Sequence, residues 1–189
     1  MNAAFVVYDG LTALDFVGAF DPITRLGTMG YLDGEWDVCA RTPTATANAG
    51  LRIGVDEVDP DLGEYDLLFV PGGYAARELV SDGQFLEWLR TGVDCEYKSS
   101  VCTGSLLLGA AGFLDGRAAT THPSAYGLLE EYCDVRSERV VADGNVITGR
   151  GVSSSIDLGL SIVETLTDRE TRTEIAEQMD YPYGEAVGP

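Results

Sequence analysis

The sequence has almost no lysine and little positive charge of any kind. Asp and Glu contribute 31 of its 189 residues, whereas Lys and Arg contribute 12, and Lys98 is the single lysine, so the formal net charge is −19. Nucleic acids and anionic membrane surfaces are bound through clustered Lys and Arg, so we expect neither as a partner. The acidic excess favours a halophilic origin, because molar salt screens repulsion between carboxylates; an ordinary acidic protein is the alternative.

Patterns typical of metal sites, disulfides, export and membrane spans are also missing. The four cysteines, Cys39, Cys95, Cys102 and Cys133, show neither CxxC nor Cys/His spacing, which argues against a metal site and a disulfide framework. The first residues lack the basic start and long apolar stretch of a signal peptide, and no apolar run approaches the roughly 20 residues of a membrane span. We expect a soluble protein of the reducing cytoplasm.

Short apolar runs alternate with helical patterns along the chain. Apolar runs that end in turns predict strands at 4–8, 36–41, 51–55, 65–70 and 99–102, and a hairpin formed by 139–141 and 146–148. Helical spacing predicts helices at 14–26, 75–80, 84–91, 103–113, 125–131 and from Ser153 onwards. This alternation predicts a single α/β domain over residues 1–189, a three-layer sandwich around a mostly parallel sheet.

Cys102 lies at a predicted junction between a strand and a helix. In such sheets, ligands bind beyond the carboxyl ends of the strands. The segment SVCTG at 100–104 has the form of a nucleophile elbow, a tight turn that holds a reactive side chain clear of the sheet. A thiol at a helix N-terminus feels the helix dipole and free N–H groups, so we expect a lowered pKa. The alternative is a buried small hydrophobic residue, as most free cysteines are.

Asp15 and two glycines should reach the same edge of the sheet. Asp15 follows the first strand in an apolar helical stretch, where burial would raise its pKa and let it hold a proton; an exposed helix face is the alternative. Gly72 and Gly73 follow a buried strand, and their backbone freedom allows an N–H to turn toward an anion or a developing negative charge. A simple turn is the alternative for this pair.

Three further residues are candidates for a role at this edge. His122 is the only histidine and raises the question of a Cys/His dyad, although a structural or exposed histidine is the alternative. Gly151, in GRGVS at 149–153, precedes the last predicted helix and is a candidate anion-binding residue, with a plain helix cap as the alternative. Arg150 would place a guanidinium near the pocket and favour an anionic ligand.

These segments together resemble the ThiJ/PfpI superfamily, with the class I glutamine amidotransferase-like, flavodoxin-like fold, over nearly the whole chain. The matching stretches are GLTALDFVG at 10–18, VPGG at 70–73, SVCTGSLLL at 100–108, ATTH at 119–122, the segment 143–158 and the tail around 180–183. The isocyanide hydratase branch is the most similar. The resemblance implies a cysteine nucleophile at Cys102, an acidic partner at Asp15, a supporting Thr103, no cofactor and a homodimer.

Two positions separate this branch from others in the superfamily. Protease-like members place a histidine directly after the nucleophile, where this chain has Thr103. Deglycase and glyoxalase-like members usually carry glutamate at the position of Asp15. The resemblance therefore favours the hydratase branch.

The leading hypothesis is a cofactor-free hydratase that converts an isocyanide into an N-substituted formamide through a thioimidate on Cys102. Asp15 would move the protons, and backbone N–H groups of Gly73 and Thr103 would hold the developing charge. One alternative is a glyoxalase or deglycase acting on small α-oxoaldehydes, with His122 as proton carrier. Another is a non-catalytic redox sensor in which Cys102 is oxidised.

Overall fold

The computed structural model describes residues 1–182, and its centre is a seven-stranded sheet. The sheet contains β1 (Asn2–Val6), β2 (Glu35–Ala40), β5 (Glu57–Val58), β6 (Leu67–Val70), β7 (Tyr97–Val101), β10 (Val140–Asp143) and β11 (Val146–Gly149). Their order is β10-β11-β7-β6-β1-β2-β5, and every neighbouring pair is parallel except β10 with β11. The predicted mostly parallel sheet is confirmed, together with the predicted hairpin.

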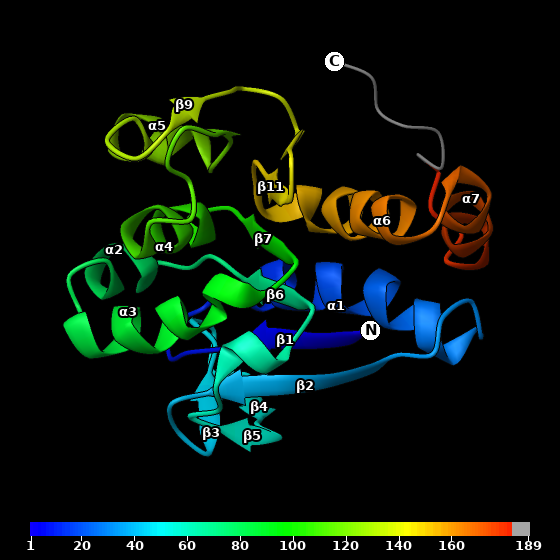
Figure 1. The fold of residues 1–189 in the computed structure, drawn as a ribbon, viewed down its shortest axis with the longest axis horizontal. Helices are drawn as coiled ribbons and strands as arrows, with labels where there is room; N and C mark the ends of the chain where they lie inside the picture. Colours follow the sequence, from blue (N-terminus) through cyan, green and yellow to red (C-terminus); the bar gives the residue numbers. More distant parts are fainter. Residues whose placement is uncertain (183–189) are drawn as a thin grey trace.

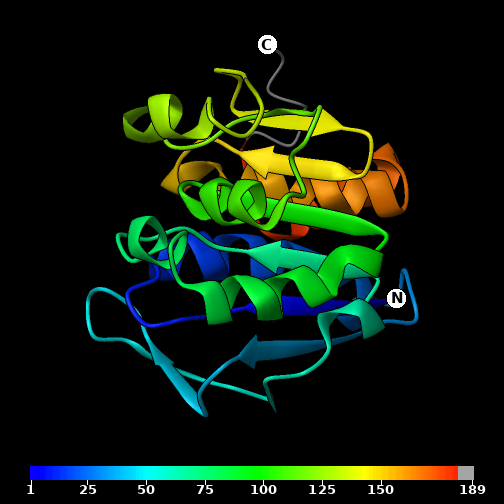
Figure 2. The ribbon, with the colours of Figure 1, turned by 60° about the vertical axis from the view of Figure 1, so that its left-hand side comes forward.

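Helices cover both faces of this sheet (Figures 1 and 2). One face carries α1 (Ala13–Thr28) and α6 (Ser155–Leu166), which pack together, with α7 (Arg169–Gln178) against α6. The other face carries α2 (Ala76–Leu79), α3 (Gly83–Arg90) and α4 (Gly104–Ala111), and α5 (Tyr126–Leu129) packs against α4. Single turns of 3-10 helix lie at η1 (Leu62–Glu64), η2 (Thr91–Asp94), η3 (Pro123–Ala125) and η4 (Val152–Ser154). This is the predicted three-layer α/β architecture.

Aromatic packing fixes α1 against the central strands. Phe5 of β1 is fully buried and lies 5.7 Å from Phe69 of the neighbouring β6, measured between ring centroids. On the helix side, Phe5 contacts Phe20 at 4.9 Å and Phe16 at 6.3 Å. Such buried aromatic contacts contribute about 0.5–1.5 kcal/mol each beyond their area. Because Phe16 follows Asp15 directly, these contacts also fix the position of that carboxyl group.

Some predicted elements differ from those of the structure. The strand predicted at 51–55 is β4 (Arg52–Gly54), which pairs antiparallel with β3 (Thr44–Thr46) outside the main sheet, because its residues are mostly exposed and cannot enter a sheet covered on both faces. A second small sheet pairs β8 (Ala118–Ala119) with β9 (Asp134–Val135).

The last predicted helix is divided in two. It begins with η4 and α6, and Thr167 then leaves the helical conformation, with φ −132° and ψ −102°. The Asp168 side chain accepts the N–H of Thr171 and so starts α7 as a separate helix. Of the tail that carries the family resemblance, Tyr183 lies outside the described residues. Within residues 1–182, none of the helices combines the length and the hydropathy required to cross a lipid bilayer.

Candidate active site

Cys102 occupies a strained turn between β7 and α4. Its φ is +57°, in the left-handed region that non-glycine residues rarely adopt. Its N–H donates to the carbonyl of Gly149 at 2.9 Å, and the hydroxyl of Thr121 donates to its carbonyl at 2.7 Å. At Gly104 a Cβ would lie 2.3 Å from the carbonyl oxygen of Val70, so only glycine lets α4 start this close to β6. This strand, turn and helix have the geometry of the predicted elbow.

Asp15 reaches the cysteine from the first turn of α1. The residue is fully buried, and its Oδ2 accepts the N–H of Gly72 at 3.1 Å. Its Oδ1 is also buried and has no hydrogen-bond partner among the described residues. Burial raises the pKa of Asp15 to about 7, partly offset by hydrogen bonds from the Cys102 thiol and from Gly72. The predicted buried carboxyl with a raised pKa is confirmed, and the alternative of an exposed helix face is wrong.

The prediction of a lowered pKa for the Cys102 thiol is wrong. Burial, and then the charge of the neighbouring Asp15, raise the pKa of this thiol to about 12, although the N–H of Thr103 lowers it. The helix N-terminus does not offset the desolvation of a side chain whose residue is only 7% exposed. The hydrogen bond between the two groups lowers the pKa of Asp15 and raises that of Cys102, so the thiol donates to the carboxylate. The pair rests as a neutral thiol beside a carboxyl group that ionises near neutral pH.

The turn after β6 holds the reacting residues together. Thr103 Oγ1 donates to the carbonyl of Gly73 at 2.9 Å and accepts its N–H at 3.0 Å. The N–H of Gly73 is therefore occupied, and the prediction that it would be a donor to developing charge is wrong for this arrangement. The N–H of Gly72 is bound to Asp15, and a Cβ at Gly72 would lie 2.6 Å from the nitrogen of Thr103. The N–H of Thr103 acts on the Cys102 side chain instead, where it lowers the pKa of the thiol.

A small cavity of about 130 Å³ opens onto Cys102. Its walls are formed by Thr12, Gly73, Tyr74, Arg77, Cys102, Thr103, His122, Ser124 and Val152. His122 thus shares the cavity with the thiol, as a dyad would require, but no hydrogen bond between the two is found within residues 1–182. The Nδ1 of His122 accepts the N–H of Ser124 at 3.2 Å, so the ring proton lies on Nε2.

Neither Arg150 nor Gly151 lines this cavity. Arg150 donates to the carbonyl of Ser137 at 3.0 Å. The N–H of Gly151 donates to Ser154 Oγ at 2.9 Å, and that hydroxyl donates back to the Gly151 carbonyl at 2.6 Å. The helix-cap alternative therefore holds for Gly151, and the guanidinium expected from Arg150 is not at the pocket.

Sequence reasoning missed three residues near the thiol. Arg77 and Tyr74 line the cavity, and Tyr74 is 80% exposed at its mouth. Tyr8 is buried, donates to the carbonyl of Pro71 at 2.7 Å and has a pKa raised well above its usual value by burial and then by Asp15 and Cys102. All three follow the carboxyl end of β1 or β6, the edge where ligands bind in such sheets. Their position after these strands could therefore have identified them from the sequence.

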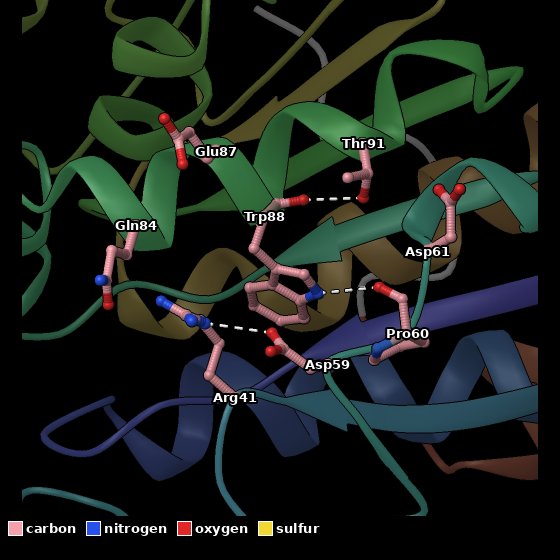
Figure 3. A pocket seen from close by; sticks show the side chains of 8 residues that line it. All are labelled: Arg41, Asp59, Pro60, Asp61, Gln84, Glu87, Trp88 and Thr91. Atoms are coloured by element: carbon pink, nitrogen blue, oxygen red, sulfur yellow. Dashed lines mark hydrogen bonds and ion pairs between the residues drawn. The ribbon is translucent and has the colours of Figure 1, made fainter.

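Another hollow, of about 520 Å³, lies beside α3 (Figure 3). It is lined by Arg41, Asp59, Pro60, Asp61, Gln84, Glu87, Trp88 and Thr91. Its main polar groups are paired with one another: Arg41 contacts Asp59 at 3.1 Å, and the indole N–H of Trp88 donates to the Pro60 carbonyl at 2.9 Å. It offers no thiol and no imidazole. In the described part of the chain, no group of three or more His, Cys, Asp or Glu side chains is arranged to hold a metal ion.

Comparisons with known proteins agree with this geometry. The model of the DJ-1/PfpI family matches residues 1–165. Isonitrile hydratase from Pseudomonas putida is 32% identical over 183 residues, which cover 96% of this chain and 78% of the relative. The glutathione-independent glyoxalase DJ-1 of Schizosaccharomyces pombe is 27% identical over 63% of this chain and 64% of its own length.

A solved structure extends the similarity to three dimensions. The crystal structure of a ThiJ/PfpI family protein from Pseudomonas syringae has a TM-score of 0.85 and 33% sequence identity, covering 96% of this chain and 75% of that one. The family model matches most of the chain, and both the sequence and the fold are similar to those of family members. The chain belongs to the DJ-1/PfpI family.

Proposed function

We propose that the protein is a cofactor-free isocyanide hydratase, which converts an isocyanide and water into an N-substituted formamide. The observation that carries this proposal is the neutral Cys102 thiol, which lies beside the buried Asp15 carboxyl and lines a small cavity. The similarity to isonitrile hydratase over 96% of the chain supports it. An isocyanide needs both a nucleophile and a proton at its terminal carbon, and this pair supplies both.

In the first step, the S–H bond of Cys102 adds across the terminal carbon of the isocyanide. Sulfur bonds to carbon while Asp15 takes the thiol proton and returns it to the same carbon, which gives a thioimidate, R–N=CH–S. A thiol with a raised pKa suits this step, because its proton is retained until the carbon needs it. A carboxyl group whose pKa is about 7 can both accept and return that proton near neutral pH.

In the second step, water converts the thioimidate into the product. Asp15 takes a proton from water as the oxygen bonds to carbon, and this proton passes to nitrogen. The carbon–sulfur bond then breaks, the hydroxyl proton returns to sulfur, and R–NH–CHO leaves. The N–H of Thr103, which favours the thiolate form of Cys102, stabilises the sulfur as the leaving group.

The test is formamide production from cyclohexyl isocyanide in molar KCl. Cys102→Ala should abolish turnover, and Asp15→Asn should lower it by about 100-fold or more, the usual contribution of a positioned acid–base group. Cys133→Ala is the matched control, because Cys133 lies outside the cavity, and it should react at the wild-type rate. Formamide produced by folded Cys102→Ala at an unchanged rate would show that the proposed mechanism is wrong.

A second candidate function is favoured by His122, which lines the same cavity with its proton on Nε2. A glyoxalase acting on small α-oxoaldehydes would use Cys102 as nucleophile and His122 as proton carrier. Lactate formed from methylglyoxal, and lost in His122→Ala, would favour this alternative. The sensor alternative is weaker, because redox-sensing cysteines are accessible and have low pKa values, whereas the pKa of Cys102 is about 12.

A further inference from the structure

Arg77 is the one charged side chain on the wall of the reaction cavity. None of the other lining residues is Lys, Asp or Glu, although the chain has 31 acidic residues. The Asp15 carboxyl is fully buried and is not part of the cavity wall. The wall of this cavity is therefore positive in a strongly acidic protein.

Among the described residues, no carboxylate forms an ion pair with Arg77. Six other arginines form ion pairs with Asp or Glu side chains within the described residues, and Arg77 forms none there. Within residues 1–182 the guanidinium makes one hydrogen bond, from Nη2 to Ser124 Oγ at 3.1 Å, and a guanidinium has five N–H groups. Its other N–H groups are available to a ligand in the cavity.

The hydrogen bonds around Arg77 leave donors on the cavity wall. A guanidinium can only donate, so Ser124 Oγ accepts from Arg77, and its own hydrogen points to His122 Nδ1 at 2.8 Å. The N–H of Ser124 donates to the same nitrogen, which leaves His122 with an N–H at Nε2. Arg77 and His122 thus both present N–H donors, an arrangement that suits a ligand rich in acceptors.

We propose that the substrate is a small isocyanide that carries a carboxylate, and that Arg77 binds this carboxylate while Cys102 attacks the isocyanide carbon. This inference rests on the proposed hydratase function. The planar fork of a guanidinium matches a carboxylate through two parallel hydrogen bonds. A cavity of about 130 Å³ is well below the roughly 300–1,000 Å³ of common small-molecule sites, so the group that joins isocyanide and carboxylate has few carbon atoms.

The test compares isocyanoacetate with isocyanoacetamide, a neutral probe of nearly the same size. Wild-type protein should prefer isocyanoacetate in kcat/KM. Arg77→Gln should lower kcat/KM for isocyanoacetate by about 10- to 100-fold, mainly through KM, because a hydrogen-bonded charge is lost. For isocyanoacetamide the same variant should change kcat/KM by less than about threefold. Arg90→Gln is the matched control, because the Arg90 guanidinium also has one acceptor in the described part of the chain, the carbonyl of Ala110, and lies outside the cavity; it should leave both substrates unaffected.

Binding to Cys102→Ala separates this inference from the proposed function. Calorimetry on this variant should show isocyanoacetate bound at least about tenfold more tightly than isocyanoacetamide, and Arg77→Gln added to it should remove the preference. That result supports carboxylate binding even if wild-type protein hydrates no isocyanide, in which case only the proposed function fails. The inference would be overturned if the two probes bound with equal affinity, if neither bound, or if the preference survived Arg77→Gln. This holds even if the wild-type protein hydrates both isocyanoacetate and isocyanoacetamide.

Discussion

Replacing Asp15 by Asn should stabilise the protein above neutral pH, because the buried carboxyl of Asp15 is costly to ionise. Asp15 is fully buried, with one oxygen that has no hydrogen-bond partner among the described residues. Burial raises its pKa from the ordinary value of 3.8 to about 7. Asn keeps the shape of the side chain and can still accept the N–H of Gly72, but it carries no charge.

The sign of the effect follows from proton binding. Between pH 4 and pH 7 the folded protein keeps the Asp15 proton while the unfolded chain loses it, so the free energy of unfolding falls as the pH rises through this window. The full difference in pKa corresponds to about 4 kcal/mol, of which about 2.5 kcal/mol is lost between pH 5 and pH 8. The stability of Asp15→Asn relative to wild type should therefore increase by about 2.5 kcal/mol from pH 5 to pH 8.

Urea unfolding at constant ionic strength measures this change. Comparing variant with wild type at each pH cancels the titration of the other acidic groups. Asp21→Asn removes a more exposed carboxyl from the same helix and controls for net charge and helix propensity. A difference between Asp15→Asn and wild type that stays constant within about 0.5 kcal/mol from pH 5 to pH 8 would refute the reasoning.

Three other substitutions or conditions test the site. The kcat/KM of wild type for cyclohexyl isocyanide should rise with pH to half its maximum near pH 7, because ionised Asp15 accepts the thiol proton, and Asp15→Asn should lose this dependence. Thr103→Val leaves the N–H of Gly73 without its partner and removes one of the two donors to the Gly73 carbonyl, the other being the N–H of Ala76, so urea unfolding should show a loss of about 1–3 kcal/mol; unchanged stability would contradict it. Gly104→Ala puts a methyl group 2.3 Å from a carbonyl oxygen of β6 and should cost about 1–3 kcal/mol, whereas Gly127→Ala, with no atom within 4 Å, should not.

The layout of the site could be predicted because it follows from sheet topology. Apolar runs that end at glycine-rich turns or at Cys102 identify β1, β6 and β7, and parallel strands bring their carboxyl ends to one edge. The apolar neighbours of Asp15 correctly indicated burial, since Phe16 beside it packs on β1.

The electrostatics and hydrogen bonds of the site could not be read from the sequence. The helix N-terminus suggested a lowered pKa for Cys102, but burial and Asp15 outweigh it, and both depend on packing between distant segments. Likewise, the N–H of Gly73 is taken by Thr103, a contact between residues 30 positions apart. Arg77, rather than Arg150, reaches the cavity because α2 follows the turn after β6.

The most direct test of the account is to trap the covalent intermediate. Wild-type protein mixed with cyclohexyl isocyanide and quenched rapidly in acid should gain the mass of one whole isocyanide, because the S–H addition loses no atoms, and peptide mapping should place this mass on Cys102. Formamide that accumulates while Cys102 stays unmodified at every quench time, or an adduct confined to another cysteine, would contradict the thioimidate mechanism.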